Sequence, residues 1–137
     1  MRPNTLSEAV DRVVAGEPLE KAFSEFLDTF YASSADTPET RFAILKDEPV
    51  MSGDAKLDAL AAAVAEYLAK QNFLRVPAWI ADQRRVLKEP WFTTTSDDPG
   101  MREWLVFSSP AEFRNHNIFT EDQPLRRKGG GSFRSPP

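Results

Sequence analysis

Residues 54–71, DAKLDALAAAVAEYLAKQ, constrain the fold more than any other stretch of the chain, because they predict one long helix that is apolar over a broad face. Three consecutive alanines at 61–63 allow a neighbouring helix to approach closely. Ser52 or Asp54 is expected to cap its start, and Asn72 is expected to end it. We expect this to be the central helix of the protein. The predicted apolar face consists of Leu57, Leu60, Ala61, Val64 and Leu68.

Three further helices are predicted ahead of it, which gives four longer helices within residues 5–72. Thr5 and Glu8 form a capping box that starts the first helix, and Gly16 suits the left-handed conformation that ends it. Pro18 fits the first turn of the second helix, whose apolar face is rich in phenylalanine. Thr37, followed by a proline and a glutamate, is expected to cap a short third helix.

Residues 76–119 follow a different pattern, in which four prolines divide an aromatic-rich segment into short pieces. Short helices and loops are predicted here, and Ser109 and Pro110 are expected to start one of the helices. The apolar run Trp104–Phe107 suits either a helix or a strand, so a small strand pair within residues 104–119 is the alternative. The predicted fold class is all-α: one helical domain over residues 1–125 with an aromatic, proline-rich second half, followed by a flexible basic tail over residues 126–137.

Composition narrows the classes of protein that the chain fits. It has no cysteine, which excludes disulfides and thiolate metal sites. No apolar run reaches the roughly 18 residues of a membrane-spanning helix, and the N-terminus has no signal-peptide core. We expect a cytoplasmic protein that does not bind membranes. The net charge of −4 is spread unevenly, because residues 1–50 carry ten acids and five bases whereas residues 101–137 carry four acids and six bases.

Catalytic and metal-binding motifs do not stand out in this sequence. His116 is the only histidine, and no nucleophile or carboxylate pair is tied to it by spacing. We interpret it as a surface histidine at the end of a short helix rather than as a general acid or base. The adjacent acids at 97–98 and 121–122 lack the rest of a calcium loop, and the glycines at 129–131 lack the strand and helix of a phosphate loop. We therefore expect a protein that is not an enzyme and has no metal or cofactor.

Aromatic residues supply the main candidate for a binding surface. All three tryptophans lie in residues 76–119, and tryptophan and arginine are enriched at the centres of protein interfaces. Those aromatics that stay exposed would mark an interface, whereas the others would wrap the long helix and complete the core. The predicted partner-binding residues are Trp79, Trp91, Phe92, Trp104, Phe113, Arg114 and His116.

The order of several motifs also resembles a known family. These motifs are the Leu/Ala-rich helix, VPAW at 76–79, EPWF at 89–92, and REWLVFSSPAEFRNHNIF at 102–119. Together they resemble a family of small, mostly uncharacterised bacterial proteins that is similar to antitoxin-like and regulator-like proteins of toxin–antitoxin and defence loci. The resemblance implies a bacterial protein that works with a partner protein, either as an antitoxin or as an accessory subunit. It carries over no catalytic residue.

A nucleic-acid-binding regulator is the alternative function. Its candidate contacts lie in the basic tail, where cations would meet phosphates and Phe133 would stack on a base. The sequence pI near 5.1 argues against a dedicated DNA-binding domain, and no helix-turn-helix is evident. The candidate nucleic-acid-binding residues are Arg126, Arg127, Lys128 and Arg134.

Overall fold

The structure is a computed structural model, and it describes residues 2–94 and 98–125. The protein is mostly helical, which confirms the predicted fold class. The elements in chain order are α1 (Leu6–Val14), α2 (Leu19–Ala32), α3 (Pro38–Lys46), α4 (Ala55–Gln71), the 3₁₀ turns η1 (Ala78–Ala81) and η2 (Gln83–Arg85), β1 (Trp91–Phe92), α5 (Pro99–Ser108), α6 (Ala111–Arg114) and β2 (Ile118–Phe119).

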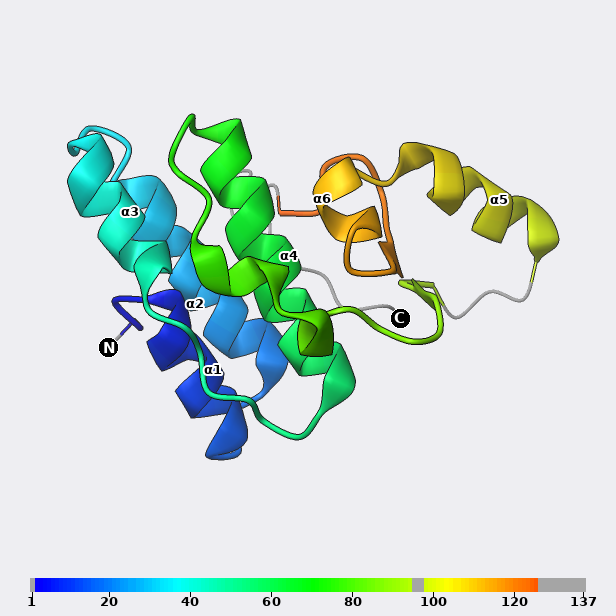
Figure 1. Ribbon diagram of the computed structural model, residues 1–137, viewed down its shortest axis with the longest axis horizontal. Helices are drawn as coiled ribbons and strands as arrows, with labels where there is room; N and C mark the ends of the chain where they lie inside the picture. The colour runs from blue at the N-terminus through cyan, green and yellow to red at the C-terminus, as the bar shows by residue number, and fades with distance from the viewer. Residues whose placement is uncertain (1, 95–97, 126–137) are drawn as a thin grey trace.

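Helix α4 is the centre of the fold, as its apolar sequence predicted. Helices α1–α3 pack on one side of it, and η1, η2 and α6 cover another side (Figure 1). Almost every side chain from Leu57 to Ala69 is buried, including the whole predicted apolar face. A helix that is apolar on nearly all sides is stable only when it is enclosed in this way. The short alanine side chains leave room for close neighbours on each side.

Two helices begin at capping residues that the sequence predicted. The Thr5 hydroxyl accepts a hydrogen bond from the Glu8 amide, and the Asp54 carboxylate accepts from the first amides of α4. The predicted stop at Asn72 is confirmed, because α4 ends at Gln71 and Asn72 is its C-cap, while the next residue, Phe73, has the left-handed backbone, with φ of 58°. The Asn72 side chain donates to the Leu68 carbonyl and accepts from Arg41, so it closes the last turn of α4 through its amide group.

Two prolines that were predicted to lie in the first turn of a helix instead lie one residue before it. Pro18 and Pro110 immediately precede α2 and α6. The capping-box prediction required Ser109 to cap α6, and this prediction is wrong. The Ser109 hydroxyl oxygen instead lies within hydrogen-bond distance of the carbonyls of Leu105 and Thr120, either of which its one proton can reach, and it accepts from the Thr120 amide. This serine therefore ties the end of α5 to the end of β2.

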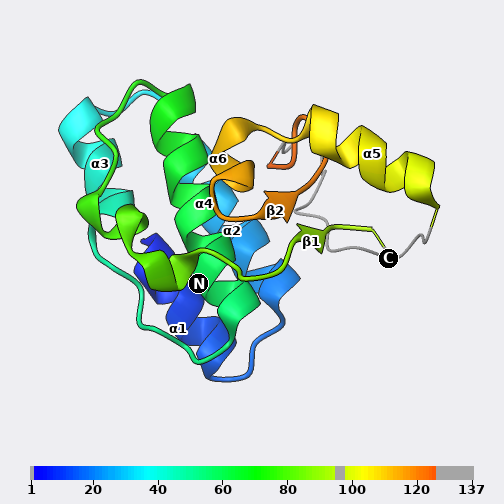
Figure 2. The same cartoon turned by 45° about the vertical axis from the view of Figure 1, so that its right-hand side comes forward.

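The two strands form a short parallel pair, visible as adjacent arrows in Figure 2, in which Trp91 is opposite Ile118 and Phe92 is opposite Phe119. The alternative prediction placed a strand pair within residues 104–119, which is correct for β2 but wrong for its partner. Residues 104–108 belong to α5, and β1 supplies the second strand. The Phe92 and Phe119 rings stack with centroids 5.1 Å apart. The pair thus closes a loop of chain that contains α5 and α6.

Candidate interaction surface

Helix α5 projects from the body of the protein, to the right in Figure 1, and we call residues Pro99–Ser108 the α5 arm. Its start is fixed locally, because the Asp98 carboxylate accepts a hydrogen bond from the Gly100 amide and a proline occupies the first turn. Its end is fixed to the body, where Leu105 is buried and the Ser108 hydroxyl donates to the Thr120 carbonyl. The side chains of the first two turns of the arm, residues 99–104, are exposed.

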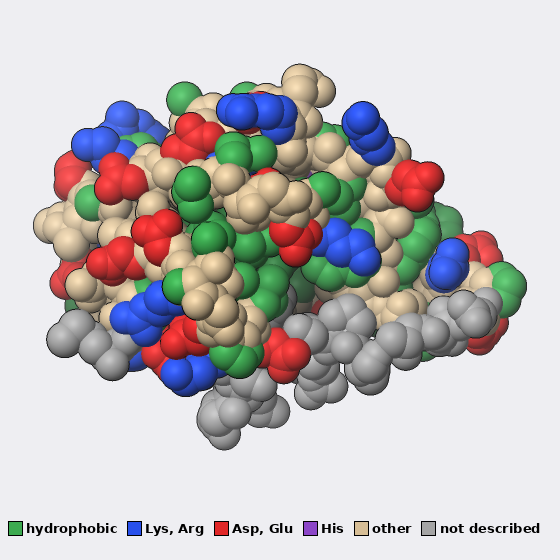
Figure 3. Space-filling model, turned by 90° about the horizontal axis from the view of Figure 1, so that it is seen from below, with side chains coloured by type: hydrophobic (Ala, Val, Ile, Leu, Met, Phe, Trp, Pro, Cys, Tyr) green, Lys and Arg blue, Asp and Glu red, His purple; other side chains and the backbone are tan. Residues whose placement is uncertain are grey.

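Apolar side chains on the α5 arm remain exposed to solvent. Trp104 is 52% exposed and Phe107 is 79% exposed, and Met101 and Val106 lie on the same helix with more than a third of their surface accessible. Figure 3 shows hydrophobic side chains (green) from the middle of the view into its right-hand part, with separate basic groups (blue) beside them. Large exposed apolar groups that gather on one element are typical of an interaction site. Of these residues, only Trp104 was predicted to bind a partner.

The other aromatic residues at the start of the segment are partly buried by specific contacts. The Trp79 indole donates to the Leu45 carbonyl at 3.1 Å, and the Arg85 guanidinium lies 4.8 Å from its ring centroid. Trp91 and Phe92 are half-buried in β1. These three side chains therefore help to hold the two halves of the protein together, and the rings of β1 still offer part of their surface.

Phe113 and His116 lie in the interior. Phe113 packs edge-on against Tyr67, with ring centroids 5.7 Å apart. His116 is 3% exposed, which differs from the surface position interpreted from the sequence. Between them, Arg114 is exposed at the end of α6. The predicted partner-binding set is therefore divided, because Phe113 and His116 are packed inside the protein whereas Trp104 and Arg114 are accessible.

His116 belongs to a buried polar cluster. Its Nδ1 lies 2.7 Å from the Arg85 carbonyl oxygen, and its Nε2 lies 3.0 Å from a carboxylate oxygen of Glu66. Both neighbours accept hydrogen bonds, so both contacts are made when the ring carries both of its protons. The other Glu66 oxygen accepts from Lys70 and Asn115. Burial raises the pKa of Glu66, but the hydrogen bonds from Lys70, Asn115 and His116 together outweigh it, and the pKa is lowered.

The chemistry available at this cluster is limited. A shallow hollow beside it is lined by Glu66, Lys70, His116 and mostly apolar residues, and the described residues that line it include no Ser, Thr or Cys. Both ring nitrogens of His116 are already engaged by protein atoms, so neither faces the hollow as a free base. Within residues 2–94 and 98–125, no group of three or more His, Cys, Asp or Glu side chains is placed to hold a metal ion.

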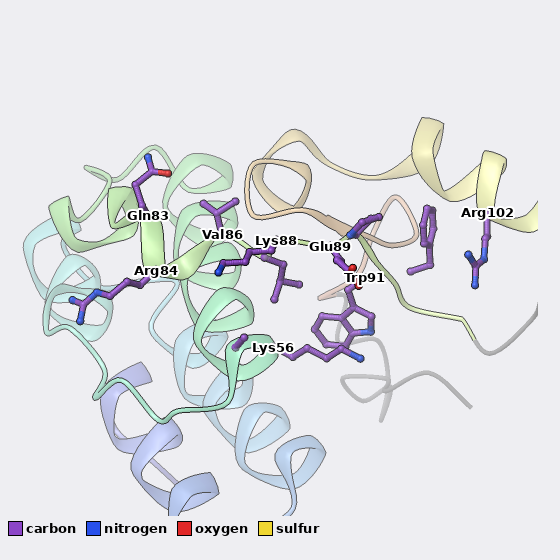
Figure 4. Close-up of a pocket in the computed structure, with 12 residues that line it drawn as sticks. Lys56, Gln83, Arg84, Val86, Lys88, Glu89, Trp91 and Arg102 are labelled. Atoms are coloured by element: carbon purple, nitrogen blue, oxygen red, sulfur yellow. The ribbon is translucent and has the colours of Figure 1, made fainter.

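A larger groove lies between the start of α4, the chain from η2 to β1, and the α5 arm. Its volume is about 1110 Å³. Lys56 lies beneath Trp91 in Figure 4, whereas Arg102 approaches from α5 on the opposite side. Arg84 points away from these residues in the same view and pairs with Asp82. We use "the groove" for this hollow, and its lining residues are Ala55, Lys56, Gln83, Arg84, Val86, Leu87, Lys88, Glu89, Pro90, Trp91, Phe92 and Arg102.

Sequence reasoning missed parts of both surfaces. Phe107 was predicted only as part of an apolar run, and its position on α5 indicates exposure only once Leu105 is known to be buried. Lys56 and Lys88 were not singled out, since isolated lysines carry no motif. The predicted nucleic-acid contacts Arg126, Arg127, Lys128 and Arg134 lie outside the described residues.

Comparisons with known proteins found no similar protein. No family model, no curated protein and no solved structure matches the chain. Among the residues that the structure describes, no helix has both the length and the apolar character needed to cross a membrane.

Proposed function

We propose that this protein is a non-enzymatic binding subunit that docks onto a partner protein through the α5 arm. The observation that carries the proposal is the exposure of Trp104 and Phe107 on a helix that projects from the body. Tryptophan in particular is enriched among the few residues that supply most of the binding energy of an interface.

The physical state of the arm supports this role. An isolated helix shorter than about 12–15 residues is only marginally stable in water, and the α5 arm has 10 residues with Leu105 as its buried anchor. A partner that covered the arm would remove the exposed Trp104 and Phe107 from water. Burial of a large apolar side chain contributes about 1.5–3 kcal/mol, so two such residues are enough to form the centre of an interface.

The buried cluster around His116 supports a role without catalysis. A general base needs a nitrogen that can reach a substrate, and both His116 nitrogens contact protein acceptors instead. This arrangement links α4, η2 and the segment after α6, and we infer that its task is to hold these elements together.

The resemblance described above favours an antitoxin or an accessory subunit as the specific role. In that case the partner is a toxin or another protein of the same locus, and the arm covers a functional surface of that partner. A direct test is to co-express the protein with the products of the neighbouring genes. We expect one product to form a stable complex and, for an antitoxin, we expect co-expression to restore growth that the partner alone inhibits.

Variants of the arm make this test specific. Trp104→Ser and Phe107→Ser are expected to weaken the complex strongly while leaving the melting temperature nearly unchanged, because both side chains are exposed. Phe73→Ser is the matched control, since Phe73 is 95% exposed but lies just beyond α4 and outside the arm. A complex that tolerates both arm variants as well as it tolerates Phe73→Ser would refute docking through the arm.

A further inference from the structure

The groove is basic although the chain as a whole is acidic. Among the residues that the structure describes, the charged lining consists of the cations Lys56, Arg84, Lys88 and Arg102 and one acid, Glu89. Arg84 is paired with Asp82 at 2.6 Å, which leaves three cations to act on a ligand. In the part of the chain that the structure describes, no ion pair is formed by Lys56, Lys88 or Arg102.

Two of these cations stand over aromatic rings. The Lys56 ammonium lies 5.2 Å from the centre of the Trp91 ring, and the Arg102 guanidinium lies 5.1 Å from the centre of the Phe92 ring. A cation over a ring face keeps its remaining hydrogen-bond donors free for an anion. The groove thus presents an aromatic floor with a positive charge at each end, and this combination suits a ligand that has apolar groups between negative ones.

The groove also borders the α5 arm, because Arg102 lines it. Trp104 and Phe107 lie on the other side of this helix, since two and five residues from Arg102 correspond to about 200° and 140° around an α-helix. One extended segment of a partner could therefore lie in the groove while another part of the partner covers the arm. A groove of about 1110 Å³ that opens to solvent can accommodate a segment of polypeptide.

We propose that the groove binds an acidic segment of the partner protein, in which Asp or Glu residues alternate with apolar or aromatic ones. This inference rests on the proposed docking function and specifies the chemistry of the partner. Carboxylates of the segment pair with Lys56 and Arg102, and its apolar side chains lie against Trp91 and Phe92. A nucleic acid strand would meet the same cations, and it is therefore the competing ligand in the test.

The test uses three fluorescent probes with the full-length protein. The first is a short peptide in which Asp and Glu alternate with Leu and Trp, and the second replaces each acid with Asn or Gln. The third is a single-stranded DNA oligonucleotide of similar length. We expect the acidic peptide to bind best, to weaken as salt is raised, and to lose about tenfold or more in affinity in the double variant Lys56→Glu, Arg102→Glu, since charges across an interface must be complementary.

Lys46→Glu is the matched control, because Lys46 is an exposed lysine in the last turn of α3, away from the groove. Equal weakening by this variant would overturn the proposal, as would equal binding of the acidic and amide peptides or tighter binding of the oligonucleotide. If the double variant fails to fold, the peptide comparison and the salt dependence on the unmodified protein still decide the question.

Each of the two proposals can be refuted without refuting the other. If Trp104→Ser and Phe107→Ser leave the native complex intact, docking through the arm is refuted whatever the peptides show. If those variants disrupt the complex but the acidic peptide binds no better than its amide counterpart, the arm is retained and the acidic-segment proposal is overturned.

Discussion

Arg85 offers the most stringent test of how this structure is held together, because its side chain is fully buried. It donates to the Pro49 carbonyl at 2.7 Å and to the Asp58 carbonyl at 3.1 Å, and it contacts the partly exposed Glu48 carboxylate at 3.2 Å. The guanidinium thereby connects the loop before α4, the helix α4 itself and η2. We predict that Arg85→Met destabilises the protein substantially.

The expected magnitude follows from what methionine leaves behind. Its chain replaces much of the arginine stem, so the main loss is the donors to Pro49 and Asp58, and a buried acceptor without a partner costs about 1–3 kcal/mol. The contact with Glu48 contributes little, since that carboxylate is 44% exposed. Relief of the buried charge offsets part of the loss, because a desolvated cation is itself unfavourable. The net loss of unfolding free energy is expected to be about 2–4 kcal/mol.

Urea denaturation at neutral pH measures this loss directly, and thermal melting should show a drop of roughly 6–15 °C for a chain of this size. Arg84→Met is the matched control, because it makes the same chemical change one residue away on an exposed side chain that pairs with Asp82. It is expected to melt like the unmodified protein. If Arg85→Met and Arg84→Met have the same unfolding midpoint, the buried arginine does not hold these elements together and the reasoning fails.

Two further predictions concern α4. Leu60→Asp and Val64→Asp each place a charge without a partner in the enclosed core, and each is expected to unfold the protein by circular dichroism, because burial of an isolated charge is very costly; a melt like that of the unmodified protein would contradict the core assignment. Glu66→Gln is expected to lower stability at neutral pH but to weaken the acid sensitivity of unfolding. The lowered pKa of Glu66 means that its carboxylate stabilises the fold above the ordinary glutamate pKa and that this contribution is lost as the pH falls through the lowered value; unfolding midpoints of both proteins at about pH 7 and pH 4 test this, and parallel losses would refute it.

The helices were predictable because their signals are local. The Thr5 and Asp54 caps and the 3.6-residue spacing of apolar positions depend only on neighbouring residues. The end of α4 at Asn72 was predictable by the same rules, but the left-handed backbone of Phe73 was not, since they favour glycine or asparagine in that conformation. The contacts of the Asn72 side chain with Leu68 and Arg41 were not predictable either, because Arg41 is distant in the sequence.

Rules that use only neighbouring residues could not predict which charged residues are buried or which aromatic residues are exposed. Glu66 reads as a solvent-facing residue on an amphipathic helix, and its partners Asn115 and His116 lie 49 and 50 residues away. Likewise, nothing in the spacing of Phe107 and Phe113 shows that one is exposed and the other buried. That difference depends on the parallel pairing of β1 with β2, which draws α6 against α4 and leaves α5 outside.

The enclosed position of α4 has a consequence for how the chain folds during synthesis. One side of α4 is covered by helices that precede it, whereas another side is covered by η1, η2, α6 and β2, which follow it. The core residue Ile118 in β2 is made 47 residues after Gln71, the last residue of α4 (118 − 71). At roughly 5–20 residues per second on the ribosome, the alanine- and leucine-rich surface of α4 stays uncovered for a few seconds after the helix itself has emerged. The nascent chain is most open to aggregation in that interval, and the short pairing of β1 with β2 ends it.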